Sequence, residues 1–200
     1  MGAEKANSAQ EKNLGWKENC MLYLHDAAYL LIIVLLLFLL VFRIIIVSGD
    51  SMKMTLIDGD YLLLLNNVFY HEPAHGDIVV ISKDSFDNGA PIVKRVIATE
   101  GQTVNIDFEA GIVYVDGQAL QEPYINNLTH NNIGTVFPLV VEENCIFVLG
   151  DNRGVSRDSR DPVIGQIDKR EVLGKALFLF FPGTDKEQVP RDYDRIGAIK

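Results

Sequence analysis

The chain contains little of what disulfide frameworks, metal sites and nucleic-acid interfaces are built from. Its 200 residues include two cysteines and one tryptophan, and its four histidines show no spacing with a carboxylate or cysteine that would indicate a triad or metal site. Positive charge is also scarce, because residues 48–200 carry 14 basic and 23 acidic side chains. This balance argues against nucleic acid as a partner, and we expect no metal and no other cofactor.

One long hydrophobic run is present near the amino terminus. From Ala27 to Val47 every residue except Arg43 is apolar. At about 1.5 Å per helical residue, these 21 residues would span the roughly 30 Å hydrocarbon core of a bilayer. We therefore predict a transmembrane helix over residues 26–47. The alternative is a cleaved signal peptide, whose apolar region is usually about 7–15 residues long and precedes a small-residue cleavage site.

The basic residues that flank this run predict its orientation. Three lysines precede it, whereas the 35 residues after Val47 contain one basic residue, Lys53. We expect residues 1–25 to form a cytoplasmic segment and residues 48–200 to form an extracytoplasmic domain, so that the protein crosses the cell membrane once. The two cysteines, Cys20 and Cys145, would then lie on opposite sides of the bilayer and could form neither a disulfide nor a zinc cluster.

Beyond the hydrophobic run, the sequence consists of short apolar segments separated by turn residues. Seven of them have β-like composition: Tyr61–Leu65, Asp77–Ile81, Ile92–Ile97, Thr103–Ile106, Ile112–Val115, Cys145–Leu149 and Leu177–Phe181. Asp116-Gly117 is typical of a hairpin turn between Ile112–Val115 and Gln118–Leu120. This spacing predicts a mainly β domain of antiparallel sheets, barrel-like in form, behind one N-terminal transmembrane helix. Glu122–Val136, rich in Asn and Thr, is expected to be a surface excursion.

Ser51 is the first candidate for chemistry. It follows Val47 by four residues, so it lies within about 14 Å of that residue even in a fully extended chain. Gly49, two residues before it, would let backbone N–H groups approach a substrate closely, as an oxyanion site requires. A serine after Gly-Asp is more often a simple turn residue, so Ser51 alone does not establish a catalytic site.

Lys94 is the second candidate, because it lies within the apolar, β-branched run Ile92–Ile97. A lysine buried there would be desolvated, which lowers the pKa of its amine. The neutral amine could take the proton of a serine hydroxyl without a histidine. The alternative is an edge-strand lysine that points to water.

A third candidate segment, Gly150–Arg160, follows the apolar run Cys145–Leu149. Its density of small polar and charged residues suits a buried, cross-linked loop. Ser156 could orient a lysine amine, and Asp158 could pair with Arg160. An ordinary surface turn rich in acids and bases is the alternative.

Taken together, these segments resemble type I signal peptidases, the Ser/Lys enzymes that remove signal peptides from exported preproteins. The short length and the Gly-Asp before the serine are similar to the compact form found in Gram-positive bacteria. The resemblance extends over the amino-terminal anchor and six further segments: Ser48–Leu56, Gly76–Ile81, Lys94-Arg95, Tyr114–Ile125, Gly150–Arg160 and Gly174–Pro182.

The resemblance implies a role for each candidate residue. Ser51 would be the nucleophile, and its backbone N–H would supply one oxyanion donor. Lys94 would be the general base, Ser156 would hydrogen-bond its amine, and Asp158 with Arg160 would brace the site. The partners would be signal peptides of secretory preproteins at the surface of the lipid bilayer.

Three positions depart from the family pattern. Gly49 stands where Gram-negative members place a serine hydroxyl, so a second oxyanion donor is missing or replaced. Met54 stands where proline is usual, which would loosen the turn after Ser51. Gln102 replaces the aspartate that usually follows Gly101. Neither the change at Met54 nor the change at Gln102 removes a catalytic group.

The family's preference for small residues one and three positions before the cut implies two shallow apolar pockets. By their positions, Ile45, Val47, Met52 and Val93 are candidates to line them. Ordinary core or membrane packing is the alternative for each of the four.

Other functions remain as alternatives. One is a signal-peptidase-like factor that assists assembly of surface structures such as pili without cutting, although such proteins lose a member of the dyad. Another is an active peptidase dedicated to a few substrates. Self-cleaving regulators of the DNA-damage response share the dyad but carry a soluble DNA-binding segment, which this chain lacks. The sequence predicts no oligomeric state.

Overall fold

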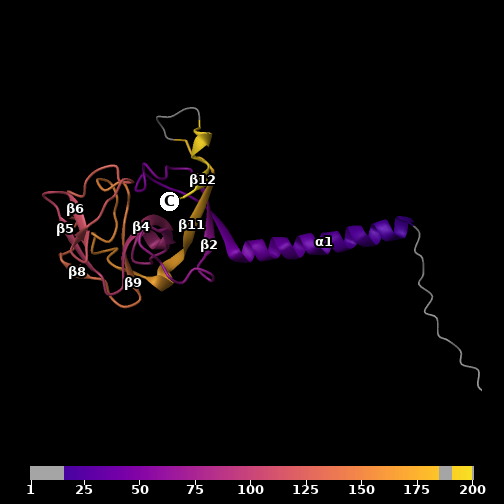
Figure 1. The fold of residues 1–200 in the computed structure, drawn as a ribbon, viewed down its shortest axis with the longest axis horizontal. Helices are drawn as coiled ribbons and strands as arrows, with labels where there is room; N and C mark the ends of the chain where they lie inside the picture. Colours follow the sequence, from indigo (N-terminus) through magenta and orange to yellow (C-terminus); the bar gives the residue numbers. More distant parts are fainter. Residues whose placement is uncertain (1–15, 185–190, 200) are drawn as a thin grey trace, which may run out of the picture. The chain divides into compact units, whose positions relative to one another are not determined.

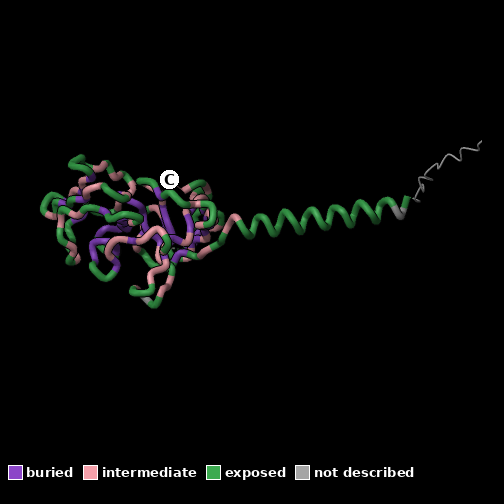
Figure 2. The backbone as a smooth tube through the Cα atoms, turned by 90° about the horizontal axis from the view of Figure 1, so that it is seen from below, coloured by how far each residue is buried: buried purple, intermediate pink, exposed green. Residues whose placement is uncertain are grey.

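The amino-terminal part of the protein is one long helix. The computed structural model describes residues 16–184 and 191–199 and separates into two units, residues 1–40 and 41–200. Helix α1 (Trp16–Val41) is exposed from residue 19 to residue 40, which Figure 2 shows in green. Within it, the 23 residues Asn19–Val41 have the length and hydropathy needed to cross a membrane. They extend for about 35 Å at the rise of an α-helix.

The helix ends six residues earlier than the hydrophobic run predicts. Phe42–Ile46 forms strand β1, which pairs antiparallel with β2 (Tyr61–Asn66) from Phe42 opposite Leu65 to Ile46 opposite Tyr61. The cause lies in the type of apolar residue: α1 is rich in leucine, whereas the run ends in three isoleucines and a valine. β-branched side chains favour strands. The predicted helix over residues 26–47 is therefore wrong at its carboxyl end.

The rest of the described chain is mainly β and all of its strand pairs are antiparallel, which confirms the predicted fold class (Figure 1). The larger sheet has the order β1-β2-β11-β3-β4-β9-β10, with β12 paired to β11. Its remaining strands are β3 (Ile78–Ile81), β4 (Ile92–Thr99), β9 (Cys145–Leu149), β10 (Ile167–Asp168), β11 (Val172–Phe181) and β12 (Gly197–Ala198).

A second, smaller sheet has the order β7-β6-β5-β8. Its strands are β5 (Thr103–Asp107), β6 (Ile112–Val115), β7 (Gln118–Ala119) and β8 (Leu139–Val140). The predicted hairpin turn between β6 and β7 is present, and both Asp116 (φ 51°) and Gly117 (φ 77°) lie in the left-handed region that a two-residue turn of this kind requires.

The side chain of Gln102 makes hydrogen bonds at the end of this smaller sheet. Its side-chain Oε1 accepts from the Thr99 N–H at 2.9 Å, and its Nε2 donates to Asp116 Oδ2 at 3.0 Å. An aspartate at this position could not donate to Asp116 and would bring a second carboxylate towards it. The departure from the family pattern at Gln102 therefore has a local structural role.

All seven predicted strands are found, and three apolar clusters hold them together. One cluster packs β2, β3, β4 and β11 around the loop that joins β1 to β2; its buried members are Val47, Met52, Leu56, Leu62, Leu64, Ile78, Val80, Val93, Ala176 and Leu179. We call it the first cluster. The second cluster lies between the smaller sheet and strands β4 and β9. The third lies on the side of β3, β9 and β10. The first cluster fixes the loop that carries Ser51.

Candidate active site

Ser51 lies in a tight turn within the loop between β1 and β2. We call residues 49–56 the Ser51 turn. Its backbone is closed by hydrogen bonds from the Lys53 N–H to the Asp50 carbonyl (3.1 Å) and from the Leu56 N–H to the Met52 carbonyl (2.8 Å). Met52 and Leu56 are each 1% exposed and belong to the first cluster. Two buried apolar side chains thus anchor the turn on either side of its exposed residues.

Two residues of this turn, Gly49 and Met54, have positive φ angles. Gly49 has φ +86°, in the region that glycine adopts without strain, and its N–H donates to Asp58 Oδ1 at 2.8 Å. Met54 has φ 94° without being glycine, and its side chain is exposed. A proline, fixed near φ −65°, could not adopt the conformation of Met54. The Ser51 turn therefore follows a path that a proline at position 54 would not allow.

Lys94 lies on β4, an interior strand between β3 and β9. Its residue is 3% exposed, so the alternative of a solvated edge-strand lysine is wrong. The amine Nζ donates to Ser51 Oγ at 2.8 Å and to the carbonyl of Val93 at 2.9 Å. The structure thus brings together the two residues that the sequence proposed as a dyad, from segments 43 positions apart.

Burial prepares the Lys94 amine to act as a base. Desolvation lowers the pKa of Lys94 from its ordinary 10.5 to about 8, while the carboxylates of Asp158 and Asp151 oppose this shift by favouring the charged form. A substantial fraction of the amine is consequently neutral at mildly alkaline pH, and a neutral amine next to a hydroxyl can accept its proton.

The loop Gly150–Arg160 packs directly on the Ser51 turn. The Asn152 N–H donates to the carbonyl of Ser51 at 3.0 Å, and Asn152 Nδ2 donates to the carbonyl of Asp50 at the same distance. Gly150 permits this approach, because a Cβ atom at that position would overlap both the Ser51 carbonyl oxygen and the side chain of Ser156. The loop is thus buried and cross-linked, as predicted, and is not a solvated surface turn.

Asp158 and Arg160 form the ion pair that the sequence analysis expected. Arg160 Nε donates to Asp158 Oδ1 at 2.8 Å and Nη2 donates to Oδ2 at 2.9 Å, and neither side chain is exposed. Asp158 Oδ2 also accepts from the Gly150 N–H at 3.0 Å. The pair therefore holds both ends of the loop, because Arg160 additionally donates to the carbonyls of Arg153 and Ser156.

Ser156 is close to the dyad but makes no hydrogen bond with it. Its side chain is buried, and within the described part of the chain its Oγ has no hydrogen-bond partner. The hydrogen bond to the Lys94 amine that the sequence analysis expected is therefore not formed. The position is nevertheless adjacent to the site, since Ser156 packs against Gly150, which in turn contacts the Ser51 carbonyl.

A second buried ion pair, whose residues are not among the predicted site residues, lies beside the dyad. Arg95 binds Asp151 through two bonds, Nε to Oδ1 at 2.9 Å and Nη2 to Oδ2 at 2.8 Å. Thr55 Oγ1 donates to the same carboxylate at 2.5 Å, and the Arg95 guanidinium lies 3.9 Å from the ring centroid of Tyr124. The sequence indicates this pair only through the positions of its residues: Arg95 directly follows Lys94, and Asp151 is the first charged residue of the loop Gly150–Arg160.

The four candidates for substrate pockets lie together. Val47, Met52 and Val93 are buried members of the first cluster, and the half-buried Ile45 packs against it. The cluster adjoins the Ser51 turn, because Met52 follows Ser51 directly. Ile45 is the most accessible of the four.

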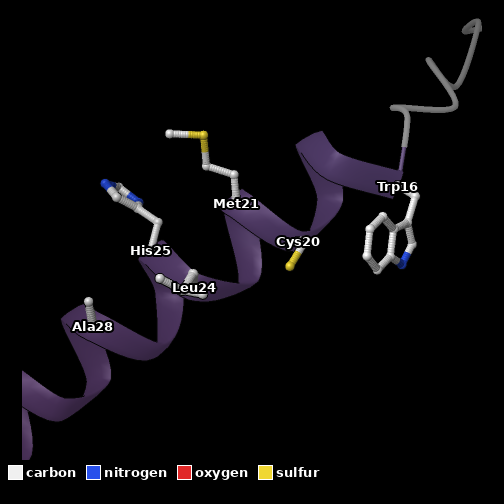
Figure 3. A pocket seen from close by; sticks show the side chains of 6 residues that line it. All are labelled: Trp16, Cys20, Met21, Leu24, His25 and Ala28. Carbon is white, nitrogen blue, oxygen red and sulfur yellow. The ribbon is translucent and has the colours of Figure 1, made fainter.

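A separate hollow lies along the first turns of α1. Figure 3 shows the six side chains that line it: Trp16, Cys20, Met21, Leu24, His25 and Ala28. All of them come from this one helix, and the hollow contains none of the candidate catalytic residues.

Comparison with known proteins assigns the chain to a family. The family model described as signal peptidase, peptidase S26, matches residues 21–181. A probable signal peptidase I-1 of Synechocystis is 40% identical over 145 residues, which is 69% of this chain and 70% of the relative. Signal peptidase I of Bacillus licheniformis is 34% identical, covering 86% of this chain and 95% of the relative.

Signal peptidase I T of Bacillus subtilis is 33% identical over 92% of this chain and 98% of its own length. The matches therefore extend through the anchor helix and the whole site described above. The chain belongs to the signal peptidase family S26, serine endopeptidases that remove signal peptides from preproteins, and its apolar amino-terminal helix fits a membrane anchor.

Proposed function

We propose that Ser51 is the nucleophile and Lys94 the general base of this signal peptidase. The observation that carries the proposal is the 2.8 Å contact between the buried Lys94 Nζ and Ser51 Oγ. Nucleophile and base must lie within hydrogen-bond reach, about 2.6–3.2 Å, for proton transfer to accompany attack. Lys94 meets this condition, and burial lowers the pKa of its amine to about 8.

The first half of the reaction forms an acyl-enzyme. Ser51 Oγ attacks the carbonyl carbon of the scissile peptide bond, and its proton passes to the neutral Lys94 Nζ. The carbonyl oxygen becomes an oxyanion, towards which the backbone N–H of Ser51 would donate. When the C–N bond breaks, the Lys94 ammonium returns the proton to the leaving amine, and the signal peptide stays attached to Ser51 as an ester.

The second half releases the signal peptide. Lys94 is again neutral and takes a proton from a water molecule, whose oxygen attacks the ester carbon. The Ser51–acyl bond then breaks, and the proton on Lys94 returns to Ser51 Oγ. The same amine thus acts as base and as acid in both halves, and the protons balance over the cycle.

Three loop residues would support the dyad. The Asp158–Arg160 pair holds the loop Gly150–Arg160 against the Ser51 turn, and the Asp158 carboxylate favours the charged Lys94 that forms during acylation. Ser156 Oγ is buried against Gly150 without a partner in the described chain, which leaves its hydroxyl available to orient the amine. Arg95 and Asp151 fix the Ser51 turn from the other side through Thr55.

The substrate would be bound beside the first cluster. Shallow apolar walls from Ile45, Val47, Met52 and Val93 would accept the small residues one and three positions before the cut. We further propose that the amino terminus is cytoplasmic and the domain extracytoplasmic, from the lysines before the helix. Because α1 ends at Val41, ten residues before Ser51, chain length allows up to about 36 Å between them.

The decisive experiment is cleavage of a purified preprotein in detergent by the wild-type enzyme, Ser51→Ala and Lys94→Ala. Wild-type protein should cut after a small-x-small sequence. Each variant should lose about 1,000-fold or more, because members of a dyad act as a unit. Glu72→Ala, which changes an exposed surface carboxylate, is the matched control and should cut at the wild-type rate.

Retention of cleavage by a folded Ser51→Ala protein would refute the assignment of the nucleophile. Loss in Ser51→Ala with full activity in Lys94→Ala would leave the nucleophile in place and refute the base. The circular dichroism spectrum and thermal midpoint of each variant identify any loss that comes from unfolding alone.

A further inference from the structure

The carboxyl-terminal segment of the described chain folds back onto the Ser51 turn. Residues 191–199 contain a single 3₁₀ turn, Tyr193–Arg195, followed by β12, which pairs with Phe178 and Leu179 of β11. The Ile199 N–H donates to the Leu177 carbonyl at 3.0 Å, and Ile199 packs against the first cluster, which includes Met52 of the Ser51 turn. Residues 197–199 are thus docked on β11 and on the first cluster.

Arg195 binds the buried carboxylate of Asp60 in the loop that carries Ser51. Its Nη1 donates to Asp60 Oδ1 at 2.8 Å and its Nη2 donates to Asp60 Oδ2 at 2.6 Å. Asp60 is completely buried at the end of the loop that carries Ser51, and its carboxylate also accepts from the N–H groups of Ile57 and Gly183. Removing Arg195 would leave a buried carboxylate without its counter-charge.

The same guanidinium also binds the backbone of the Ser51 turn. Arg195 Nη2 donates to the Thr55 carbonyl at 3.3 Å. Thr55 directly follows Met54, whose φ of 94° is unfavourable for a residue with a side chain. Such a conformation persists only where surrounding contacts fix it. Thr55 is held by its side chain, through Asp151, and by its carbonyl, through Arg195.

We propose that Arg195 is a positioning residue for catalysis: it fixes the Ser51 turn from the carboxyl-terminal side, so that Ser51 Oγ stays within reach of the Lys94 amine. The inference rests on the proposed role of Ser51 as nucleophile. Lys94 is held by β4, whereas Ser51 depends on the path of its turn, so a shift of the turn lengthens the Oγ–Nζ contact directly. A displacement of about 1 Å is enough to reduce a rate about 100-fold.

The experiment uses Arg195→Lys in the full-length protein in detergent, with Arg191→Ala as control. An ammonium can pair with Asp60 as a point charge, but it cannot bind both carboxylate oxygens and the Thr55 carbonyl as the planar fork does. We expect kcat to fall at least 10-fold, KM to stay within 2-fold, and the midpoint of the pH profile to stay at its wild-type value. Arg191 belongs to the same carboxyl-terminal segment as Arg195, and its guanidinium lies over the ring of Phe181. Arg191→Ala should keep the wild-type kcat.

A second variant, Asp60→Asn with Arg195→Ala, removes the buried charge together with its partner. It should fold and show the same loss of kcat, because the bond to Thr55 is absent again. Wild-type kcat in either folded variant would overturn the inference. A kcat that falls only in proportion to the unfolded fraction, measured by thermal unfolding, would also overturn it, since Arg195 would then be merely structural.

Ser51→Ala is assayed in parallel to separate the two proposals. If that variant still cleaves, the assignment of the nucleophile fails whatever the Arg195 variants do. If it is inactive while Arg195→Lys retains full kcat, the dyad stands and the positioning role of Arg195 falls.

Discussion

At the scale of single residues, the proposed mechanism gives a buried lysine, Lys94, the role of general base that histidine has in other serine peptidases. Lys94 owes its lowered pKa to desolvation on an interior strand, and two nearby carboxylates keep that pKa from falling further. The balance between these effects sets the pH at which the amine can accept a proton. It also means that the residue costs stability while charged, because a buried ammonium is poorly solvated.

Activity should depend on pH through this amine. Since the neutral form is active, kcat/KM should increase about tenfold per pH unit below the pKa of about 8 and reach a plateau above it. The free energy of unfolding should also increase with pH, between pH 8 and about 10.4. Over this range the folded protein binds fewer protons than the unfolded chain.

Peptide cleavage from pH 6 to 10 and thermal unfolding over the same range test both parts. A kcat/KM midpoint near 6.5 would point to a histidine instead and contradict the assignment of Lys94.

Ser156 gives a second prediction at this scale. Ser156→Ala should lower kcat about 10-fold, because the amine loses the hydroxyl that could orient it. It should leave the free energy of unfolding unchanged or slightly increased, because a buried hydroxyl without a partner in the described chain costs about 1–3 kcal/mol.

Steady-state cleavage and urea unfolding measure the two effects separately. Wild-type kcat would remove Ser156 from the mechanism. A large loss of stability would show that its hydroxyl is bonded in solution.

At the scale of elements, the sequence predicts where most strands lie along the chain, but it does not predict which strands are neighbours in a sheet. The apolar composition of Ile92–Ile97 identified β4, but only the pairing with β3 and β9 shows that Lys94 lies on an interior strand. The apolar run 27–47 predicts a single helix, although its final isoleucines form β1. Four strands of two residues, β7, β8, β10 and β12, are too short for periodicity to reveal, and β7 was predicted only from the turn before it.

The site itself was predictable where residues are close in sequence and not where they are distant. Asp158 and Arg160, two positions apart, were paired correctly from sequence. Arg195 and Asp60 are 135 positions apart, and no local pattern indicates that they meet. The conformation of Met54 was likewise not predictable, because its φ results from contacts on both sides of Thr55.

The loop Gly150–Arg160 gives a prediction about stability. Asp158→Ala should lower the free energy of unfolding by about 3–5 kcal/mol, since it leaves the buried Arg160 without its carboxylate and the Gly150 N–H without its acceptor. It should also reduce kcat at least 10-fold.

Glu72→Ala breaks an exposed ion pair with Lys169 and should change stability by less than about 1 kcal/mol. Urea unfolding of both variants provides the comparison. Equal stabilities would contradict the bracing role of the Asp158–Arg160 pair.

At the scale of the whole molecule, charge and hydropathy are distributed unequally along the chain. Residues 1–47, which include the apolar helix, have no net charge. The net charge of −9 comes from residues 48–200. This distribution is the basis for the proposed topology, which depends on three lysines and is therefore best tested directly.

Single cysteines in a Cys20→Ala, Cys145→Ala background should report the topology in protoplasts. Val136→Cys, at a residue that is 82% exposed, should react with a membrane-impermeant maleimide in intact protoplasts. Ser8→Cys, before the helix, should react only after permeabilisation. The reverse pattern would invert the proposed orientation, and reaction of both without permeabilisation would contradict a single crossing.

Gly150 has a consequence for how mutations in this protein should be interpreted. It contributes no functional group, yet any side chain there would separate the Ser51 carbonyl from Ser156 and move apart the two segments that meet at the dyad. Saturation mutagenesis would therefore find this position as intolerant as the nucleophile itself. A search for active-site residues guided by side-chain chemistry would pass over it, because what the position supplies is the absence of a single methyl group.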